Sequence, residues 1–282
     1  MKSMINKYIF GNPINTCAVE DNIPESAADQ IQHIGLSSDR MHISYRMDDN
    51  DIVYGLGEQV RGINKRGWIY DNCCTDDSTH TEGKHSLYGA HNFIVIDGKE
   101  HFGLFIDTPG EVRFDIGYSE QDILEIGLKE PGYSLYLIAG SSAADIVHQF
   151  RILIGKSYIP PKWAFGFGQS RWSYMNENEV REVADRYRQQ HIPLDSIYLD
   201  IDYMDHYKDF TVNEETFPEF QKFVGEMKSR HIHLVPIIDA GVKKEDGYPV
   251  YEEGKAKGYF CTDSDGNDFV AAVWPGQAMG RQ

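Results

Sequence analysis

The stretch PPKWAFGFGQSRWSY, residues 160–174, separates two different patterns of sequence. Pro160 and Pro161 end regular structure, because proline lacks an amide donor and keeps the residue before it out of the helical region. Beyond them, apolar runs alternate with amphipathic stretches, a rhythm typical of βαβ units that share a parallel sheet. We therefore predict two domains, residues 1–157 and residues 158–282.

After the two prolines we expect three strands and two helices. Each strand is a short apolar run, and each helix carries apolar residues three and four positions apart. Asn176 and Glu179 are placed like a capping box at the start of the first helix. The expected elements are a strand at 163–169, a helix at 176–190, a strand at 196–202, a helix at 218–230 and a strand at 234–239. Pro236 fits a central strand poorly, because it removes a ladder donor, and residues 240–282 are expected to form a long excursion.

Before the prolines, the sequence favours an antiparallel β-sandwich. Short runs of strand-forming residues are separated by Gly, Pro and Asp turn signals. They lie at 52–56, 93–96, 103–106, 112–116, 123–126 and 134–138. Residues 97–100, Asp-Gly-Lys-Glu, predict a hairpin turn, since Asp and Gly tolerate the turn dihedrals, and residues 142–153 predict a helix.

Composition and charge argue against several classes of function. The 282 residues carry a formal net charge of −17, which repels phosphate backbones and anionic lipid, so we expect neither a nucleic-acid nor a membrane partner. No apolar run suits a signal peptide or a membrane-spanning helix, and a cytoplasmic location is the expectation. Cys73, Cys74, His80 and His85 match no zinc spacing, so we predict no metal site and no cofactor.

Polar side chains follow each of the three expected parallel strands. Gln169 and Arg171 follow the first, Asp200 and Asp202 end the second, and Asp239 ends the third. In barrel enzymes the carboxyl ends of the strands form the active face. A strand would place Asp200 and Asp202 on one side, where two like charges are costly without a ligand, a cation or an arginine partner. The alternative is a solvent-exposed pair, or a cap of the next turn.

Several motifs, in a consistent order, resemble segments of glycoside hydrolase family 31, the α-glucosidase and α-xylosidase family. Residues 160–174 are similar to its first barrel strand, residues 200–204 (DIDYM) to its second, and residues 237–239 (IID) to its third. Residues 54–58 (YGLGE) and 273–276 (VWPG) match further segments. The resemblance implies an N-terminal antiparallel β-sandwich followed by the first three βα units of a (β/α)8 TIM barrel, which this chain leaves incomplete.

The resemblance also implies a sugar pocket, the −1 subsite. Asp200 is similar to the family carboxylate that accepts hydrogen bonds from hydroxyls of this sugar, a role that suits an ionised acceptor. Ile201, Ile237 and Trp274 are similar to the apolar walls of the pocket, and Asp239 is similar to a polar group at its floor. For Trp274 the alternative is ordinary core packing.

Two further residues resemble contacts to the next sugar, in the +1 subsite. Trp172 is similar to an aromatic side chain whose flat ring packs on the apolar face of that sugar. Asp76 is similar to a residue that an inserted loop of the β-domain brings to it. The alternatives are core packing for Trp172 and a turn residue for Asp76.

The family uses a retaining mechanism with two carboxyl groups about 5–5.5 Å apart, one a nucleophile and the other an acid/base. The resemblance places both beyond Gln282, so we expect no catalytic residue in this chain and no activity of the chain alone. Residues 277–282 depart from the Phe-Pro-Asp continuation of the family, which we interpret as truncation, a frameshift or a fragmentary gene.

The function implied for a complete enzyme is release of terminal α-linked glucose from an oligosaccharide or disaccharide, with retention of configuration. The complete enzyme could be a homo-oligomer. One alternative is an α-xylosidase of the same family, and another is a carbohydrate-binding protein that does not cleave its sugar.

Overall fold

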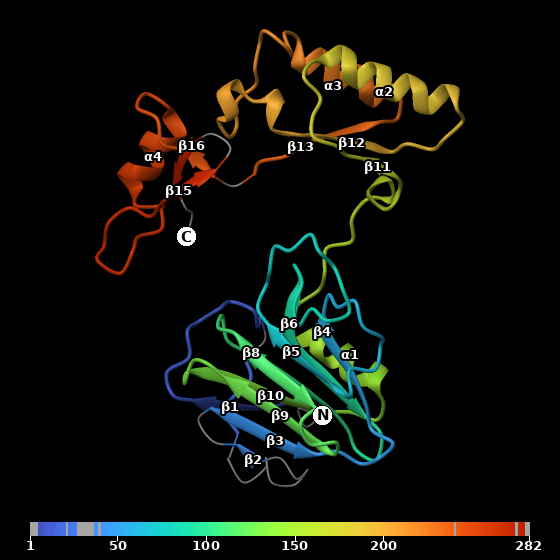
Figure 1. Cartoon of the computed structure of the whole chain (residues 1–282), viewed down its shortest axis with the longest axis vertical. Helices are drawn as coiled ribbons and strands as arrows, with labels where there is room; N and C mark the ends of the chain where they lie inside the picture. Colours follow the sequence, from blue (N-terminus) through green and yellow to red (C-terminus); the bar gives the residue numbers. More distant parts are fainter. Residues whose placement is uncertain are drawn as a thin grey trace. The chain divides into compact units, whose positions relative to one another are not determined.

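The computed structural model describes residues 5–20, 22–26, 37–38, 41–239, 241–273 and 276–279. The chain forms two compact units, Met1–Tyr158 (unit 1) and Ile159–Gln282 (unit 2), each with its own hydrophobic core (Figure 1). Across the described residues, no helix combines the length and apolar character needed to cross a membrane.

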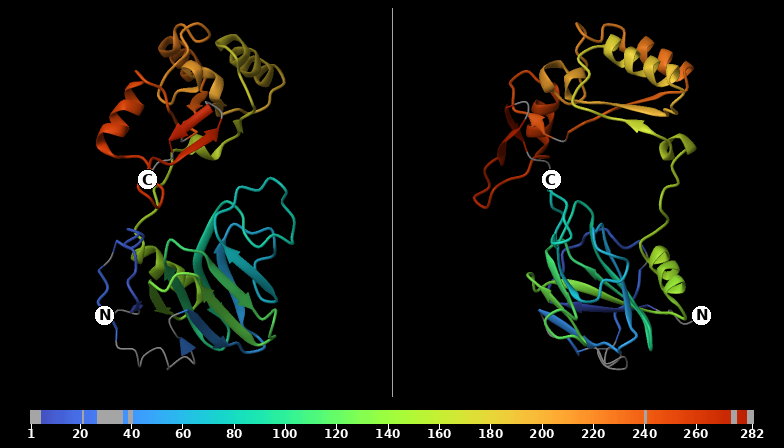
Figure 2. Two further views of the ribbon diagram at one scale, coloured as in Figure 1. Left: turned by 60° about the vertical axis from the view of Figure 1, so that its left-hand side comes forward. Right: turned by 45° about the vertical axis from the view of Figure 1, so that its right-hand side comes forward.

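Unit 1 contains two five-stranded sheets, and neighbouring strands in both are antiparallel (Figure 2). The first has the order β1 (Ile5–Phe10), β10 (Tyr133–Ala139), β7 (His101–Asp107), β6 (Ala90–Asp97) and β4 (Ile52–Gly57). The second has the order β2 (Ser37–Ser38), β3 (His42–Arg46), β9 (Ile123–Leu128), β8 (Val112–Ile116) and β5 (Trp68–Asn72). The predicted antiparallel sandwich is confirmed.

The two sheets share one core. Side chains alternate across a strand, so each sheet turns one row of apolar residues toward the other. Ile94 and Ile96 of β6 and Phe114 of β8 are fully buried there. Val95, between the two isoleucines, belongs instead to the cluster around helix α1 (Ala143–Leu153). Each such side chain contributes about 1.5–3 kcal/mol by leaving water, which makes this core the main source of stability in unit 1.

Helix α1 packs on the first sheet. Its Ile146 is fully buried in a cluster with Val95 of β6 and Tyr136 of β10. Gly103 of β7 permits this close approach, because a Cβ there would lie 2.6 Å from Cγ2 of Ile146. Ser142 caps the helix, since its hydroxyl accepts a hydrogen bond from the amide of Asp145 at 3.2 Å.

The strands expected before residue 140 are all present in unit 1. The turn at residues 97–100 joins β6 to β7, with Asp97 opposite His101, so the predicted hairpin is confirmed. Strands β1, β2, β3 and β5 were not predicted. Their short runs are polar, as in Ser37–Ser38 of β2, or mix polar and apolar side chains, as in HISYR of β3, and pairing with a neighbouring strand decides their conformation.

Unit 2 opens with a three-stranded parallel sheet of order β11 (Gly168–Gln169), β12 (Ser196–Leu199) and β13 (His233–Pro236). Helices α2 (Glu177–Gln189) and α3 (Phe220–Ser229) alternate with the strands along the chain and lie on the same side of the sheet (Figures 1 and 2). The apolar stripes of the helices meet the sheet in one buried cluster, which includes Val180, Ala184, Ile197, Leu199, Phe223 and Met227. The predicted βα units of an incomplete barrel are confirmed.

The strand bounds predicted for unit 2 were too long. The expected strand at 163–169 is instead a 3-10 turn at Lys162–Phe165 followed by the short β11. Strand β12 ends at Leu199, and β13 ends at Pro236. The proline is tolerated because it is the last residue of β13, which lies at an edge of the described sheet.

The expected excursion has a small fold of its own. Strands β14 (Val242–Lys243), β16 (Gly276–Met279) and β15 (Val270–Val273) form an antiparallel sheet in this order. Helix α4 (Pro249–Lys257) lies between β14 and β15 in the chain. Its apolar side chains and those of the sheet form a separate cluster that includes Val242, Tyr248, Tyr251, Phe260 and Met279.

Candidate sugar-binding pocket

A pocket of about 500 Å³ lies at the carboxyl ends of β12 and β13 in unit 2. Its lining residues are Trp172, Asp200, Ile201, Ile237 and Asp239. All five were predicted as site residues, and the structure brings them together although they lie on three separate segments of the chain. The pocket presents two carboxylates and two isoleucine side chains, with an exposed indole ring at its margin.

Asp200 owes its position to the end of β12. Its Oδ1 accepts a hydrogen bond from the amide of Ile201 at 2.8 Å, and this starts a 3-10 turn at Ile201–Tyr203. Extended backbone would have carried Asp202 to the same side as Asp200, but the turn prevents that. Oδ1 of Asp202 instead accepts a hydrogen bond from the hydroxyl of Tyr207 at 3.4 Å. The prediction that Asp200 and Asp202 form a pair on one strand was wrong.

The opposite side of the pocket comes from the end of β13. The amide of Ile237 donates to the carbonyl of Leu199 at 3.1 Å, which continues the contact between the two strands past the ladder. Asp239 has a φ of 51°, in the left-handed region that residues other than glycine rarely occupy. The hydroxyl of Tyr203 donates to the carbonyl of Ile237 at 2.8 Å. Tyr203 was not predicted as a site residue, because nothing in its position beside Asp202 indicates a contact with the next strand.

The loop before α2 holds Trp172. The indole side chain is 78% exposed, but its neighbours are anchored. Nε of Arg171 donates to the carbonyl of Ser173 at 3.2 Å, and Nη2 of Arg171 lies 3.3 Å from Oε2 of Glu179. Asn176 caps α2 by accepting from the amide of Glu179 at 3.1 Å. The Glu179 carboxylate in turn accepts a hydrogen bond from the amide of Met175. Asn176 and Glu179 together therefore connect the loop to the helix.

The structure leaves the predictions for two site residues, Asp76 and Trp274, untested. Asp76 belongs to unit 1, on the exposed loop between β5 and β6. A hydrogen bond from Tyr88 to the carboxylate of Asp76 raises the pKa of Tyr88. Trp274 lies outside the described residues. Among the residues that are described, no three His, Cys, Asp or Glu side chains are grouped so that they could hold a metal ion.

Two family models match the chain. The model of the glycosyl hydrolase 31 N-terminal galactose mutarotase-like domain matches residues 15–115, and the model of the glycosyl hydrolases family 31 TIM-barrel domain matches residues 157–280. The chain belongs to glycoside hydrolase family 31. The family that the sequence motifs predicted is therefore confirmed.

This family 31 chain is similar to several larger proteins. α-Glucosidase 2 of Bacillus thermoamyloliquefaciens is 37% identical over 235 residues, which cover 82% of this chain and 30% of that protein. α-Xylosidase 1 of Arabidopsis thaliana is 32% identical, with coverage of 84% and 26%. A family 31 dextranase of Flavobacterium johnsoniae, solved with isomaltotriose, has a TM-score of 0.78 at 24% identity, with coverage of 88% and 30%, and this likeness shows the fold alone. The chain spans less than a third of the length of each of these proteins.

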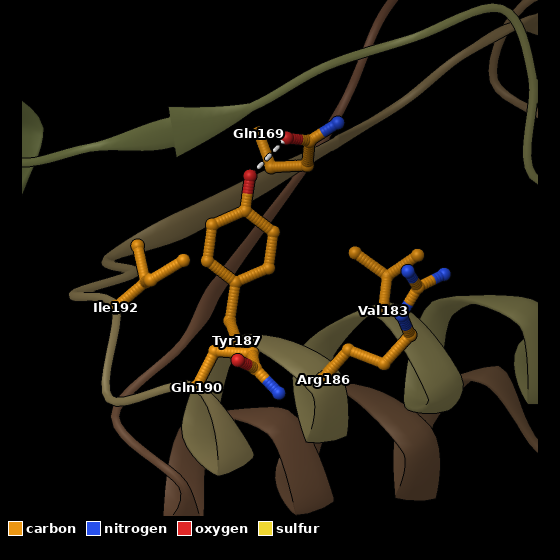
Figure 3. Close-up of a pocket in the computed structure, with 6 residues that line it drawn as sticks. All are labelled: Gln169, Val183, Arg186, Tyr187, Gln190 and Ile192. Atoms are coloured by element: carbon orange, nitrogen blue, oxygen red, sulfur yellow. Dashed lines mark hydrogen bonds between the residues drawn. The ribbon is translucent and has the colours of Figure 1, made fainter.

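A second hollow in the family 31 chain, of about 280 Å³, lies along α2 (Figure 3). Its lining residues are Gln169, Val183, Arg186, Tyr187, Gln190 and Ile192. The hydroxyl of Tyr187 donates to Oε1 of Gln169, as the dashed line in Figure 3 shows. The sequence had suggested that Gln169 faces the ligand together with Asp200. That suggestion was wrong, because Gln169 lines this second hollow and is absent from the pocket that Asp200 lines.

Proposed function

We propose that the pocket at the ends of β12 and β13 binds the terminal glucose of an α-linked oligosaccharide, and that it forms part of the substrate site of a retaining α-glucosidase. One observation carries the proposal. Side chains from three segments, chosen from the sequence for this role, line a single pocket of about 500 Å³, a size that suits a small ligand.

The chemistry of the lining suits a sugar. Asp200 and Asp239 supply carboxylate oxygens, which accept hydrogen bonds from the paired hydroxyls of a pyranose ring. Ile201 and Ile237 supply apolar surface for the C–H faces of the ring, and the exposed indole of Trp172 can pack on the next sugar. Asp76 and Trp274 are assigned to the +1 and −1 subsites by the family resemblance alone.

Hydrolysis itself needs groups that we do not assign within residues 1–282. The family mechanism uses one carboxylate as nucleophile and a second as acid/base, and the resemblance places both after Gln282. We therefore propose that the chain by itself binds sugar without cleaving it. In a complete enzyme, the pocket would hold the glucose while those two groups act on its anomeric carbon.

The test is calorimetric titration of the 282-residue chain with glucose and with maltose. We expect binding that Asp200→Asn abolishes, because the amide cannot replace a charged acceptor of two hydroxyl donors. Asp202→Asn is a matched control two residues away, since Asp202 does not line the pocket, and it should bind sugar like the parent. No binding by the parent chain, or equal losses in both variants, would remove the proposal.

The two alternatives lead to different results. An α-xylosidase site should prefer xylose over glucose, because the hydroxymethyl group would then meet the pocket wall instead of open space. A carbohydrate-binding protein without activity should bind maltose and still show no turnover after the rest of a family 31 barrel has been supplied. Preference for glucose and turnover in the completed barrel would together favour the α-glucosidase.

A further inference from the structure

Tyr203 connects the two sides of the sugar pocket. Its side chain is 5% exposed and belongs to the buried cluster under α3, where its ring stacks on Phe220 with centroids 6.2 Å apart. Its backbone closes the 3-10 turn that carries Asp200 and Ile201. Its hydroxyl donates to the carbonyl of Ile237 at 2.8 Å. One anchored residue therefore joins the two segments, by its backbone to the Asp200–Ile201 segment and by its hydroxyl to Ile237.

This bond lies where the regular pairing of the two strands stops. The parallel ladder of β12 and β13 ends at Leu199 opposite Pro236, and the amide of Ile237 adds one bond to Leu199 at 3.1 Å. Beyond that point one segment turns into a 3-10 conformation, and the other reaches Asp239 with a φ of 51°. Neither conformation is held by the sheet, so the Tyr203 hydroxyl restrains the separation of the segments past the ladder.

We propose that Tyr203 is a positioning residue that fixes the distance between the Asp200–Ile201 side and the Ile237–Asp239 side of the pocket. This inference rests on the proposed sugar-binding function. Tyr203 does not line the pocket, so it acts through the residues that do. A ligand held by groups on both sides loses contacts when one side shifts by about 1 Å, which is why supporting residues matter as much as the contacts themselves.

Two variants separate this role from ordinary core packing. Tyr203→Phe keeps the ring and removes only the bond to the Ile237 carbonyl. Tyr248→Phe is a matched control, because Tyr248 is 4% exposed and its hydroxyl donates to the backbone carbonyl of Asp209 at 2.6 Å. Both changes remove a buried hydrogen bond from a phenol to a backbone carbonyl. Tyr248 does not line the pocket, and its hydrogen bond goes to Asp209, which does not line the pocket either.

The first measurement is calorimetric titration of the full chain with maltose. We expect Tyr203→Phe to bind roughly five- to tenfold more weakly, the equivalent of one lost hydrogen bond, and Tyr248→Phe to bind like the parent. Equal affinity for Tyr203→Phe and the parent, or the same loss in both variants, would overturn the inference. A parent chain that binds no sugar would instead overturn the proposed function.

A second measurement tests the role of Tyr203 without depending on sugar binding. Hydrogen exchange at the Ile237 amide reports how firmly the end of β13 is held against Leu199. We expect Tyr203→Phe to accelerate exchange there roughly tenfold, with no change in Tyr248→Phe, whether or not sugar binds. Unchanged exchange in Tyr203→Phe would show that the hydroxyl does not restrain the pocket wall, and this would overturn the inference independently of the function.

Discussion

The carboxylate of Asp71 lies 2.7 Å from Nδ1 of His85, which joins β5 to the loop that carries Asp76. Nη1 of Arg113, opposite Asp71 in the sheet, donates to the other carboxylate oxygen at 2.7 Å. Burial pushes the pKa of Asp71 upward, but the His85 hydrogen bond and the Arg113 charge outweigh it and lower the pKa below its usual value. Asp71 is therefore an ion-paired anchor of this loop.

Asp71 should make unit 1 less stable in acid. A lowered pKa in the folded state stabilises the fold above the unfolded pKa, and the contribution is lost as the pH falls through the folded value. We expect the free energy of unfolding of unit 1 to fall as the pH drops below the ordinary pKa of an aspartate and through its lowered value in the folded state, with about 1 kcal/mol of that loss absent in Asp71→Asn. Urea unfolding at several pH values measures it, and an identical acid slope in the variant would contradict the assignment.

The two helix caps should act on different units. Ser142→Ala removes the acceptor for the Asp145 amide on α1, and Asn176→Ala removes the acceptor for the Asn178 and Glu179 amides on α2. Each loss should cost about 1 kcal/mol. In a two-step unfolding curve, Ser142→Ala should shift only the transition of unit 1, and Asn176→Ala only that of unit 2. A shift of both transitions by either variant would show that the units unfold together.

The chain by itself should hydrolyse p-nitrophenyl α-glucoside no faster than buffer. Our assignment leaves it without a nucleophile and without a general acid, the two groups that the reaction needs. The assay is release of p-nitrophenol by repurified protein. Turnover that survives repurification and disappears in Asp200→Ala would mean that the chain is catalytic by itself.

In a completed enzyme, Asp200→Ala should weaken transition-state binding. A hydrogen bond to a charged group contributes about 1.5–3 kcal/mol, which corresponds to a loss of roughly 10- to 150-fold in kcat/KM. Steady-state kinetics on maltose measures the loss, with Asp202→Asn as the nearby control. An Asp200→Ala variant within about twofold of the parent would show that this carboxylate does not face the sugar.

The barrel part should be less protected than the sandwich. In the described sheet, β11 and β13 each lack a second neighbour, and open edges promote association. Phe165 and Phe167 are 74% and 51% exposed, and exposed aromatic side chains beside an open edge favour association. We expect residues 160–282 to be less stable than unit 1 and prone to aggregate in the isolated chain.

Limited proteolysis followed by mass spectrometry tests this difference between the units. A resistant fragment that ends near residue 157 is the expected result, because local stability differs between parts of a chain. The core of unit 1, with Ile94, Ile96 and Phe114 fully buried between two sheets, should protect that fragment. Equal resistance of a monomeric barrel part would require the view of an incomplete fold to be withdrawn.

The sequence by itself determined the fold class, the family and most of the pocket. Short runs of strand-forming residues between turn signals predicted the strands around Ile94 and Phe114, and helical spacing predicted α2 and α3, because both patterns depend on local geometry. Asp200 and Asp239 could be named because polar residues directly after buried strands stand at the active end of a parallel sheet.

Only the tertiary structure decided how the strand ends are shaped. The change at Asp200 from strand to 3-10 turn depends on a bond from its own side chain to the next amide, and it sends Asp202 to Tyr207 instead of into the pocket. The link from Tyr203 to Ile237 joins residues 34 positions apart. Periodicity reports which face a side chain takes within one element, and it contains no information on where two loops meet after their strands have ended.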